Sequence, residues 1–348
     1  MRFTAGILSA ILAISMVKAE MPICGAWKGA SYEAAKTQYP ELKDAIDVVQ
    51  QYGSVPWYTD NQGVADQQKV IDTLKGCDPN TKIPIVVYGI PNKDCEANYS
   101  NKGINKSEQD YQAFIVRLTA AFPSQNMIYI VEPDAMGLLA DSKCAQDNMY
   151  GDRVRYAINE LSKNPSAELY LDVGYWTLAN DAQRKKIVDA VNAVWTPGSK
   201  LKGIALNTSN YQKTEKILEL CDKFATESGR SDAKCIVDTS RNHKGPTSAN
   251  EWCNANNAGI GQPPTMQTGN ARAAYYLWVK PPGESDGTCT EQKSGESMIG
   301  PDAGHFFKEH FDLLWKNSYF VEKGETKPKP QTTGIGFDML GQNATTRV

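Results

Sequence analysis

Short apolar runs recur along this chain at intervals that suit a parallel β-sheet. Seven of them are rich in β-branched and aromatic residues: Ser54–Tyr58, Ile83–Tyr88, Met127–Glu132, Glu168–Val173, Gly203–Leu206, Cys235–Asp238 and Ala274–Lys280. Segments with helical periodicity fill most of the intervals, as in Tyr111–Phe122, Asp152–Lys163, Ala182–Val194 and Tyr211–Ser228. Strands that alternate with helices pair in parallel through right-handed crossovers. The pattern therefore predicts an α/β domain with a barrel-like sheet of about seven strands.

Polar side chains gather just after these apolar runs. They are Trp57, Asp60, Tyr88, Asp94, Asp134, Asp172, Asn207, Asn210, Asp238, Arg241, Lys280, Glu284 and Asp286. In parallel α/β architectures the carboxyl ends of the strands form the edge that hosts the active site. Any single one of these residues is equally well interpreted as a helix cap or a loop residue. Their recurrence on most strands favours a shared site.

Three of the apolar runs end on carboxylates. Asp134 closes the run from Ile128, Asp172 closes another, and Glu284 and Asp286 follow a third. Cleavage of a glycosidic bond requires one carboxylic acid to protonate the leaving oxygen and further carboxylates to activate water and offset positive charge. The sequence therefore predicts glycoside hydrolysis.

The N-terminus has the pattern of a secretory signal, with a basic start at Arg2, an apolar stretch to about Val17 and cleavage after Ala19. No later stretch approaches the ~20 apolar residues of a membrane helix. Eight cysteines form an even set without a paired zinc-binding spacing, which in a secreted protein predicts four disulfides and no metal. We expect residues 1–19 to be a signal peptide, 20–321 one catalytic domain and 322–348 a polar tail.

The net charge argues against nucleic acid and membrane partners and does not identify any other partner. The formal net charge of -3, with 22% charged residues, provides no basic face for nucleic acid or for a membrane surface. Four glycosylation sequons fit secretion; we expect glycans first at Asn98 and Asn105, with Asn343 a further sequon and Asn207 bare because a glycan there would block the cleft. We expect a monomer that needs no cofactor.

Eight motifs follow one another in a definite order. They are Val86–Cys95, Glu132–Asp134, Tyr170–Gly174, Leu206–Tyr211, Ile236–Arg241, Glu251–Asn254, Trp278–Gly287 and Pro301–Gly304. With these motifs the chain resembles the family 6 glycoside hydrolases, the cellulases that include endoglucanases and cellobiohydrolases acting on β-1,4-glucan. The resemblance covers most of the mature chain. It implies a distorted parallel β/α barrel and hydrolysis with inversion of configuration.

The resemblance also implies a role for each matching residue. Asp134 corresponds to the general acid, Asp94 to a partner that raises its pKa, and Asp286 to the candidate base, with direct or water-relayed deprotonation left open. Tyr88 would press on the distorted sugar. The residues expected to contact sugar are Trp57, Asp172, Trp176, Asn207, Trp252, Lys280 and Glu284, where each tryptophan is equally well interpreted as a core aromatic.

Two disulfides, Cys95–Cys144 and Cys253–Cys289, are implied by the resemblance, which leaves Cys24–Cys77 and Cys221–Cys235 to pair by elimination. The chain departs from the family in two places. Asn92-Lys93 stands where an acid and an arginine are usual, and lysine cannot make a bidentate guanidinium contact. Val173-Gly174-Tyr175-Trp176 replaces a longer loop, which predicts an altered subsite.

Loop lengths favour an open cleft. The segments 95–111 and 286–301 are shorter than in tunnel-forming members of the family, so internal positions of a glucan chain should reach the site. The expected activity is an endoglucanase on β-1,4-glucan such as cellulose. The alternatives are a processive cellobiohydrolase, an inactive glucan-binding protein of the same fold, and a retaining hydrolase with carboxyls only about 5–5.5 Å apart.

Overall fold

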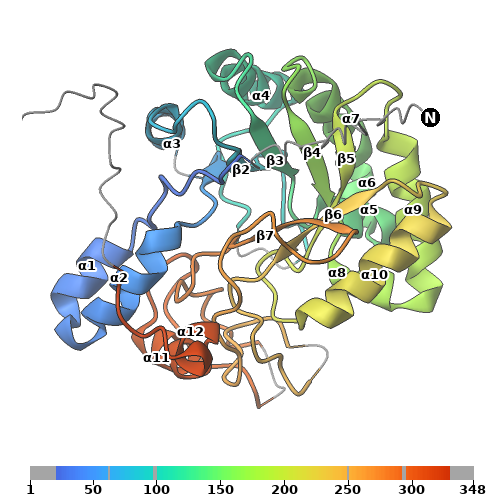
Figure 1. Ribbon diagram of the computed structural model, residues 1–348. Helices are drawn as coiled ribbons and strands as arrows, with labels where there is room; N and C mark the ends of the chain where they lie inside the picture. Colours follow the sequence, from blue (N-terminus) through green and yellow to red (C-terminus); the bar gives the residue numbers. More distant parts are fainter. Residues whose placement is uncertain (1–20, 62, 97–99, 249–250, 292–294, 330–348) are drawn as a thin grey trace, which may run out of the picture.

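The computed structural model describes residues 21–61, 63–96, 100–248, 251–291 and 295–329. Its centre is a sheet of seven parallel strands in sequential order, curled into a half-barrel (Figure 1). The strands are β1 (Trp57–Thr59), β2 (Ile83–Tyr88), β3 (Met127–Val131), β4 (Glu168–Asp172), β5 (Leu201–Leu206), β6 (Lys234–Asp238) and β7 (Ala273–Leu277). The predicted distorted β/α barrel is confirmed.

Alternation along the strands divides the core into two layers. On β2, Ile85 and Val87 belong to the large apolar cluster between the sheet and its helices, whereas Val86 and Tyr88 belong to a smaller cluster inside the barrel. Successive side chains point to opposite faces, so a strand covered on both sides is apolar throughout. This explains why the strands appear in the sequence as continuous apolar runs.

The outer helices that follow the strands are α3 (Val64–Lys75), α4 (Glu108–Ala121), α7 (Tyr150–Leu161), α9 (Asp181–Val194) and α10 (Thr214–Glu227). The four helices predicted from periodicity correspond to α4, α7, α9 and α10. Ser107 explains the start of α4, because its side chain accepts a hydrogen bond from the Asp110 N–H in a capping box. The short helices α5 (Ala135–Asp141), α6 (Lys143–Asp147) and α8 (Tyr175–Ala179) have only five to seven residues each, too few to show a helical period.

A second helical group lies below the open side of the half-barrel, between its first and last strands (Figure 1). It contains α1 (Tyr32–Gln38), the 3₁₀ turn η1 (Pro40–Leu42), α2 (Lys43–Tyr52), α11 (Lys308–Lys316) and α12 (Tyr319–Lys323). These helices share an apolar cluster with Trp278, which directly follows β7. The expected tail at 322–348 therefore begins inside α12, and the Lys329 N–H still bonds Gln51 on α2. The predicted signal peptide and the rest of the tail lie outside the described residues.

The first strand is shorter than the predicted Ser54–Tyr58. Pro56 has no N–H to donate to a sheet, and the Val55 N–H bonds the Trp278 carbonyl at 2.8 Å instead of a strand neighbour. This contact closes part of the gap between the two edge strands. β7 likewise ends at Leu277, before the predicted Lys280.

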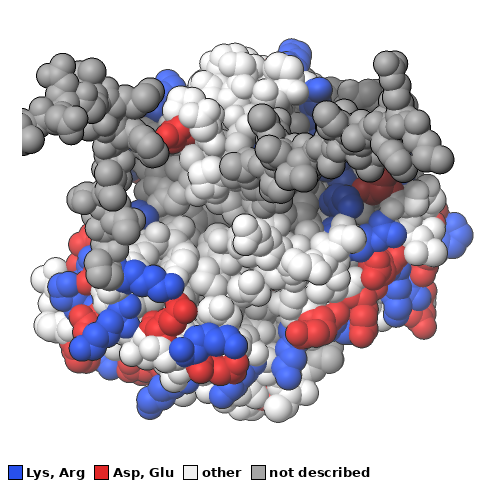
Figure 2. Space-filling view, in the orientation of Figure 1, with Lys and Arg blue, Asp and Glu red and all other residues white. Residues whose placement is uncertain are grey.

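Four disulfides join Cys24–Cys77, Cys95–Cys144, Cys221–Cys235 and Cys253–Cys289, as expected. On the face shown in Figure 2, acidic and basic side chains are mixed over the helices and leave an uncharged band between them. None of the described helices is long and apolar enough to cross a bilayer.

Candidate active site

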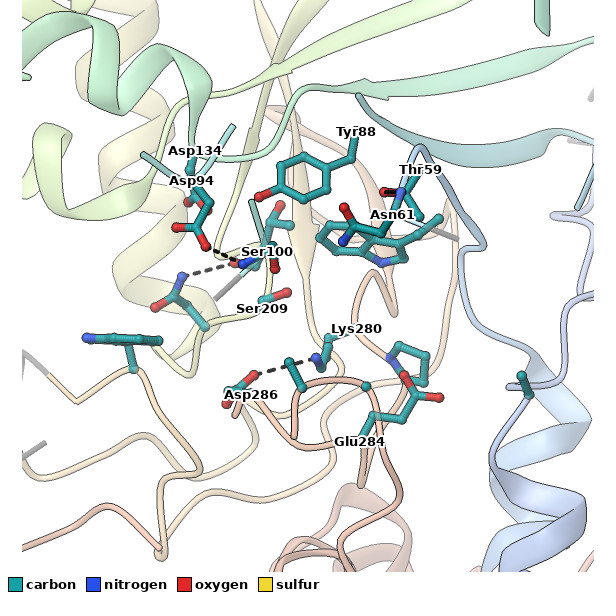
Figure 3. A pocket seen from close by; sticks show the side chains of 18 of the residues that line it. Thr59, Asn61, Tyr88, Asp94, Ser100, Asp134, Ser209, Lys280, Glu284 and Asp286 are labelled. Atoms are coloured by element: carbon teal, nitrogen blue, oxygen red, sulfur yellow. Dashed lines mark hydrogen bonds and ion pairs between the residues drawn. The ribbon is translucent and has the colours of Figure 1, made fainter. Parts of the chain in front are cut away.

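A cavity of about 720 Å³ lies at the carboxyl ends of the strands. Its walls include Trp57, Tyr88, Asp94, Asp134, Trp176, Trp252, Lys280, Glu284 and Asp286, which are nine of the residues singled out from the sequence. Figure 3 shows Asp94, Asp134 and Tyr88 on one side, with Lys280, Glu284 and Asp286 facing them. The cavity thus combines carboxylates, a cation and aromatic faces.

Asp134 sits at the end of the turn Glu132-Pro133-Asp134, which we call the acid turn. Its backbone is left-handed, with φ of 66°, and its N–H donates to Asp172 Oδ1 at 3.0 Å. Burial raises the pKa of Asp134 to about 8, with further contributions from the negative charges of Asp172 and Asp94. The carboxyl therefore keeps its proton near neutral pH, which is the requirement for a general acid.

Asp94 is held by the loop that follows it, because its Oδ2 accepts the Ser100 N–H at 2.6 Å. The preceding residue, Lys93, is buried and forms an ion pair with the buried Asp60. The Lys93 ammonium also lies 5.2 Å from the centre of the Tyr88 ring. Lys93 therefore pairs with Asp60 beneath the cavity wall through a single ammonium group.

Tyr88 and Trp57 form an aromatic corner. Their ring centres are 5.4 Å apart at an interplanar angle of 88°, and the indole N–H of Trp57 donates to the Val279 carbonyl at 2.8 Å. Burial and the charges of Asp134, Asp94 and Glu132 raise the pKa of Tyr88 well above its usual value. Tyr88 is consequently a neutral phenol that can donate a hydrogen bond.

Asp286 on the facing wall is tied to three donors. Arg241 Nη1 lies 2.9 Å from each of its oxygens, and the Tyr211 hydroxyl and the Asn254 N–H donate to Oδ2 at 2.5 and 3.0 Å. Burial opposes ionisation, but Arg241 and Lys280 outweigh it and hold the pKa of Asp286 below its usual value. Asp286 is therefore an ionised, firmly oriented carboxylate.

Lys280 and Glu284 complete this wall. Lys280 Nζ donates to the Ser285 carbonyl at 3.0 Å and lies 3.8 Å from Asp286 Oδ1. Glu284 accepts from the Ser31 hydroxyl at 3.0 Å, so the segment before α1 reaches the cavity. Burial raises the pKa of Glu284 and lowers the pKa of Lys280.

The sequence also matches the family description "Glycosyl hydrolases family 6" over residues 26–318. The chain belongs to glycosyl hydrolase family 6. A Fusarium oxysporum protein named as a type B endoglucanase is 30% identical over 282 residues, which are 67% of this chain and 60% of that protein. The chain thus spans about three fifths of that relative's length.

Two further relatives carry different activity names. A 1,4-beta-D-glucan cellobiohydrolase of Podospora anserina is 27% identical and covers 80% of both chains. The endoglucanase Cel6 of Mycobacterium tuberculosis, solved with a thio-linked methyl cellobiosyl-cellobioside, superimposes with a TM-score of 0.70 at 26% identity, over 86% of this chain and 98% of that one. Family 6 relatives of this chain thus include both endo-acting and exo-acting names.

Two residues expected to contact sugar in this family 6 site do not line the cavity. Asn207 is buried; its amide donates to the Gln212 and Asp238 carbonyls, and its Oδ1 accepts the Gln212 N–H. Asp172 is buried and lies under Asp134, with burial raising its pKa to about 6. Each side chain is turned toward backbone groups that shape the edge of the sheet, and sugar contact by either residue stays a prediction.

The burial of Asn105 contradicts the expectation of a glycan at this residue. Asn105 is only 5% exposed, and its Nδ2, the atom that would carry the sugar, donates to the Gly89 carbonyl at 2.8 Å. Asn207, expected bare, is buried as well. The sequons at Asn98 and Asn343 lie outside the described residues.

Several lining residues had no role predicted from the sequence. Trp27 and Ala30 come from the N-terminal segment, and Thr208 and Ser209 lie within the motif Leu206–Tyr211. The disulfide of Cys24 was the available signal for Trp27, since it anchors this segment to the barrel. Among the described residues, no cluster of three or more His, Cys, Asp and Glu side chains could hold a metal.

Proposed function

We propose that this protein is a secreted, inverting endo-β-1,4-glucanase with Asp134 as its general acid. The observation that carries the proposal is the pairing of Asp134, whose pKa is raised to about 8, with the ionised Asp286 across the cavity. Two titratable groups whose surroundings push their pKa values apart can act as acid and base in one reaction. Family membership supports the same chemistry.

In the proposed reaction the Asp134 proton moves to the glycosidic oxygen as the bond between that oxygen and the anomeric carbon breaks. The carbon develops oxocarbenium-like positive charge. Asp94, which faces the same part of the cavity, stabilises this charge and keeps the pKa of Asp134 high. The neutral Tyr88 hydroxyl lies above the reacting sugar, and Trp57 and Trp252 provide flat faces for neighbouring sugar units.

Water attacks the opposite face of the anomeric carbon and inverts it. Asp286 is the proposed acceptor of the water proton, but its contacts with Arg241 and Tyr211 make it a weak base. The proton reaches Asp286 either directly or through a second water, and Asp286 is the final acceptor in both routes. Inverting enzymes need roughly 6.5–9.5 Å between the two carboxyls to hold the water.

The endo-acting mode follows from the short loops at 95–111 and 286–301, which favour an open cleft. The disulfides and the N-terminal signal pattern support secretion. The substrate we propose is a β-1,4-glucan chain whose internal bonds reach Asp134.

The test compares viscosity loss with reducing ends released from a soluble β-1,4-glucan, for the wild type and Asp134→Asn. We expect a steep early fall in viscosity and about a 10³-fold lower kcat in the variant, since general acid catalysis contributes 10²–10⁴-fold. The α-anomer of the fresh product, read by NMR, would support inversion.

Other outcomes select the alternatives. Slow viscosity loss with accumulating cellobiose would indicate a processive cellobiohydrolase. A fresh β-anomer would indicate a retaining hydrolase. Binding without turnover on any β-1,4-glucan would leave the inactive glucan-binding protein.

A further inference from the structure

Glu132, the first residue of the acid turn, is a buried carboxylate outside the cavity wall. It is 1% exposed and has a left-handed backbone, with φ of 50°. Side chains larger than glycine rarely adopt this conformation, and here it occurs twice within three residues, at Glu132 and at Asp134. A turn of this kind persists only when its surroundings hold it firmly.

The Glu132 carboxylate forms the contacts that hold it. The Gly89 N–H donates to both of its oxygens at 3.1 and 3.0 Å, and the Ile90 N–H donates to Oε2 at 3.2 Å. The Tyr111 hydroxyl on α4 donates to Oε1 at 2.8 Å. One side chain on the acid turn therefore binds the two residues that directly follow Tyr88 at the end of β2.

The path of this segment requires glycine at position 89. A Cβ at Gly89 would lie 2.4 Å from the Phe114 ring, so the backbone passes this helix too closely for any side chain. Beyond Ile90 the same segment continues through Pro91 and Asn92, whose carbonyls accept from Arg153 and Tyr150 on α7. The path from Tyr88 to Asp94 is thus anchored first at Glu132 and then at α7.

We propose that Glu132 is a positioning residue that sets the separation of Tyr88 and Asp94 from the acid Asp134. The inference rests on the proposed hydrolytic function. Glu132 links the acid turn, which carries Asp134, to the segment from Tyr88 to Asp94. Its loss would therefore move these catalytic groups relative to one another. Misplacement of a catalytic group by about 1 Å can lower a rate by about 10²-fold.

The experiment uses the full chain and three substitutions at this position. Glu132→Ala removes all the acceptors. Glu132→Gln keeps a carbonyl for the Gly89 and Ile90 N–H groups and an amide that can donate to the Tyr111 oxygen. Glu132→Asp keeps a carboxyl group but places it one methylene further from the Gly89 and Ile90 N–H groups. Glu160→Ala, which removes another buried carboxylate from the outer helix α7, is the matched control.

We expect Glu132→Ala to lower kcat about 100-fold with KM within threefold. Glu132→Gln should recover at least tenfold of that loss, and Glu160→Ala should stay within threefold of wild type. A stability role alone would instead lower Tm and leave the kcat of the folded fraction unchanged. If Glu132→Ala does not fold, the comparison of Glu132→Asp with Glu132→Gln decides, with the aspartate variant expected to be slower.

Failure of this inference is distinguishable from failure of the proposed function. Wild type that turns over no β-1,4-glucan contradicts the proposed function itself. Active wild type with a folded Glu132→Ala of normal kcat, or with a loss confined to KM, overturns the role of Glu132.

Discussion

At the scale of single residues, the two walls of the cavity shift the pKa values of their carboxyl groups in opposite directions. Asp134 has like charges as neighbours and a raised pKa, whereas Asp286 has Arg241 and Lys280 and a lowered one. The difference arises from partners, because both side chains sit at the same edge of one sheet. The division of labour between acid and base is therefore electrostatic.

Asp172 provides a direct test of this electrostatic control. The acid must be protonated, so activity should fall as pH rises through about 8, the pKa of Asp134. Asp172→Asn keeps the oxygen that accepts the Asp134 N–H but removes a negative charge, so the alkaline limb of kcat/KM should move to lower pH. Glu284→Gln on the facing wall is the control, and its alkaline limb should stay at the wild-type pH. If the alkaline limb of Asp172→Asn also stays at the wild-type pH, the assignment of that limb to Asp134 is contradicted.

At the scale of elements, buried carboxylates connect the ends of neighbouring strands. Glu132 binds the loop after β2, and Asp172 binds the acid turn after β3. Asp238 at the end of β6 accepts N–H groups from Ser209 after β5 and from Val279 and Lys280 after β7. Each carboxylate satisfies backbone donors that the sheet leaves unpaired at its edge. The rim of the cavity is rigid because adjacent loops share these acceptors.

The disulfides allow a matched comparison at the same scale. Cys253–Cys289 joins loops beside Trp252 and Asp286, whereas Cys221–Cys235 joins α10 to β6; their sequence separations are 36 and 14. Replacing either pair by serines should destabilise the fold by a similar amount, about 3–4 kcal/mol. Only loss of Cys253–Cys289 should also raise KM, by about threefold or more. Equal KM values for the two variants would show that the first bridge does not shape the cavity.

At the scale of the whole molecule, the buried carboxyl groups of the site lower the stability of the fold at high pH. Burial raises the pKa of Asp172, Glu132 and Asp134 to about 6, 7 and 8, from ordinary values of 3.8, 4.5 and 3.8. The folded state therefore holds more protons than the unfolded chain between about pH 4 and pH 8. In that window the free energy of unfolding falls as pH rises.

We expect the Tm to be lower at pH 8.5 than at pH 6.5, measured by calorimetry in buffers of equal ionic strength. The lowered pKa of Asp286 contributes only at pH values below this window, so it does not reverse the sign. Glu132→Gln should reduce the difference, since it removes one of the three groups. A Tm that is equal or higher at pH 8.5 would exclude strongly raised carboxyl pKa values.

The sequence by itself determined the order of the strands and of four outer helices, the barrel-like parallel sheet, and nine of the residues in the cavity wall. These follow from local periodicity and from the rule that parallel strands end on one edge. The family motifs implied two of the four disulfide pairs and the proposed residue roles, and the other two pairs followed by elimination. Only the tertiary structure decided which polar residues face the cavity. Asp172 and Asn207 end strands as Asp134 does, yet hydrogen bonds with backbone groups turn them inward: Asp172 accepts the Asp134 N–H, and the Asn207 amide donates to the Asp238 carbonyl. Trp27 lines the cavity in a segment that the nearby Cys24 ties to Cys77, 53 residues further along the chain. Such contacts join residues far apart in the chain, so no local pattern encodes them.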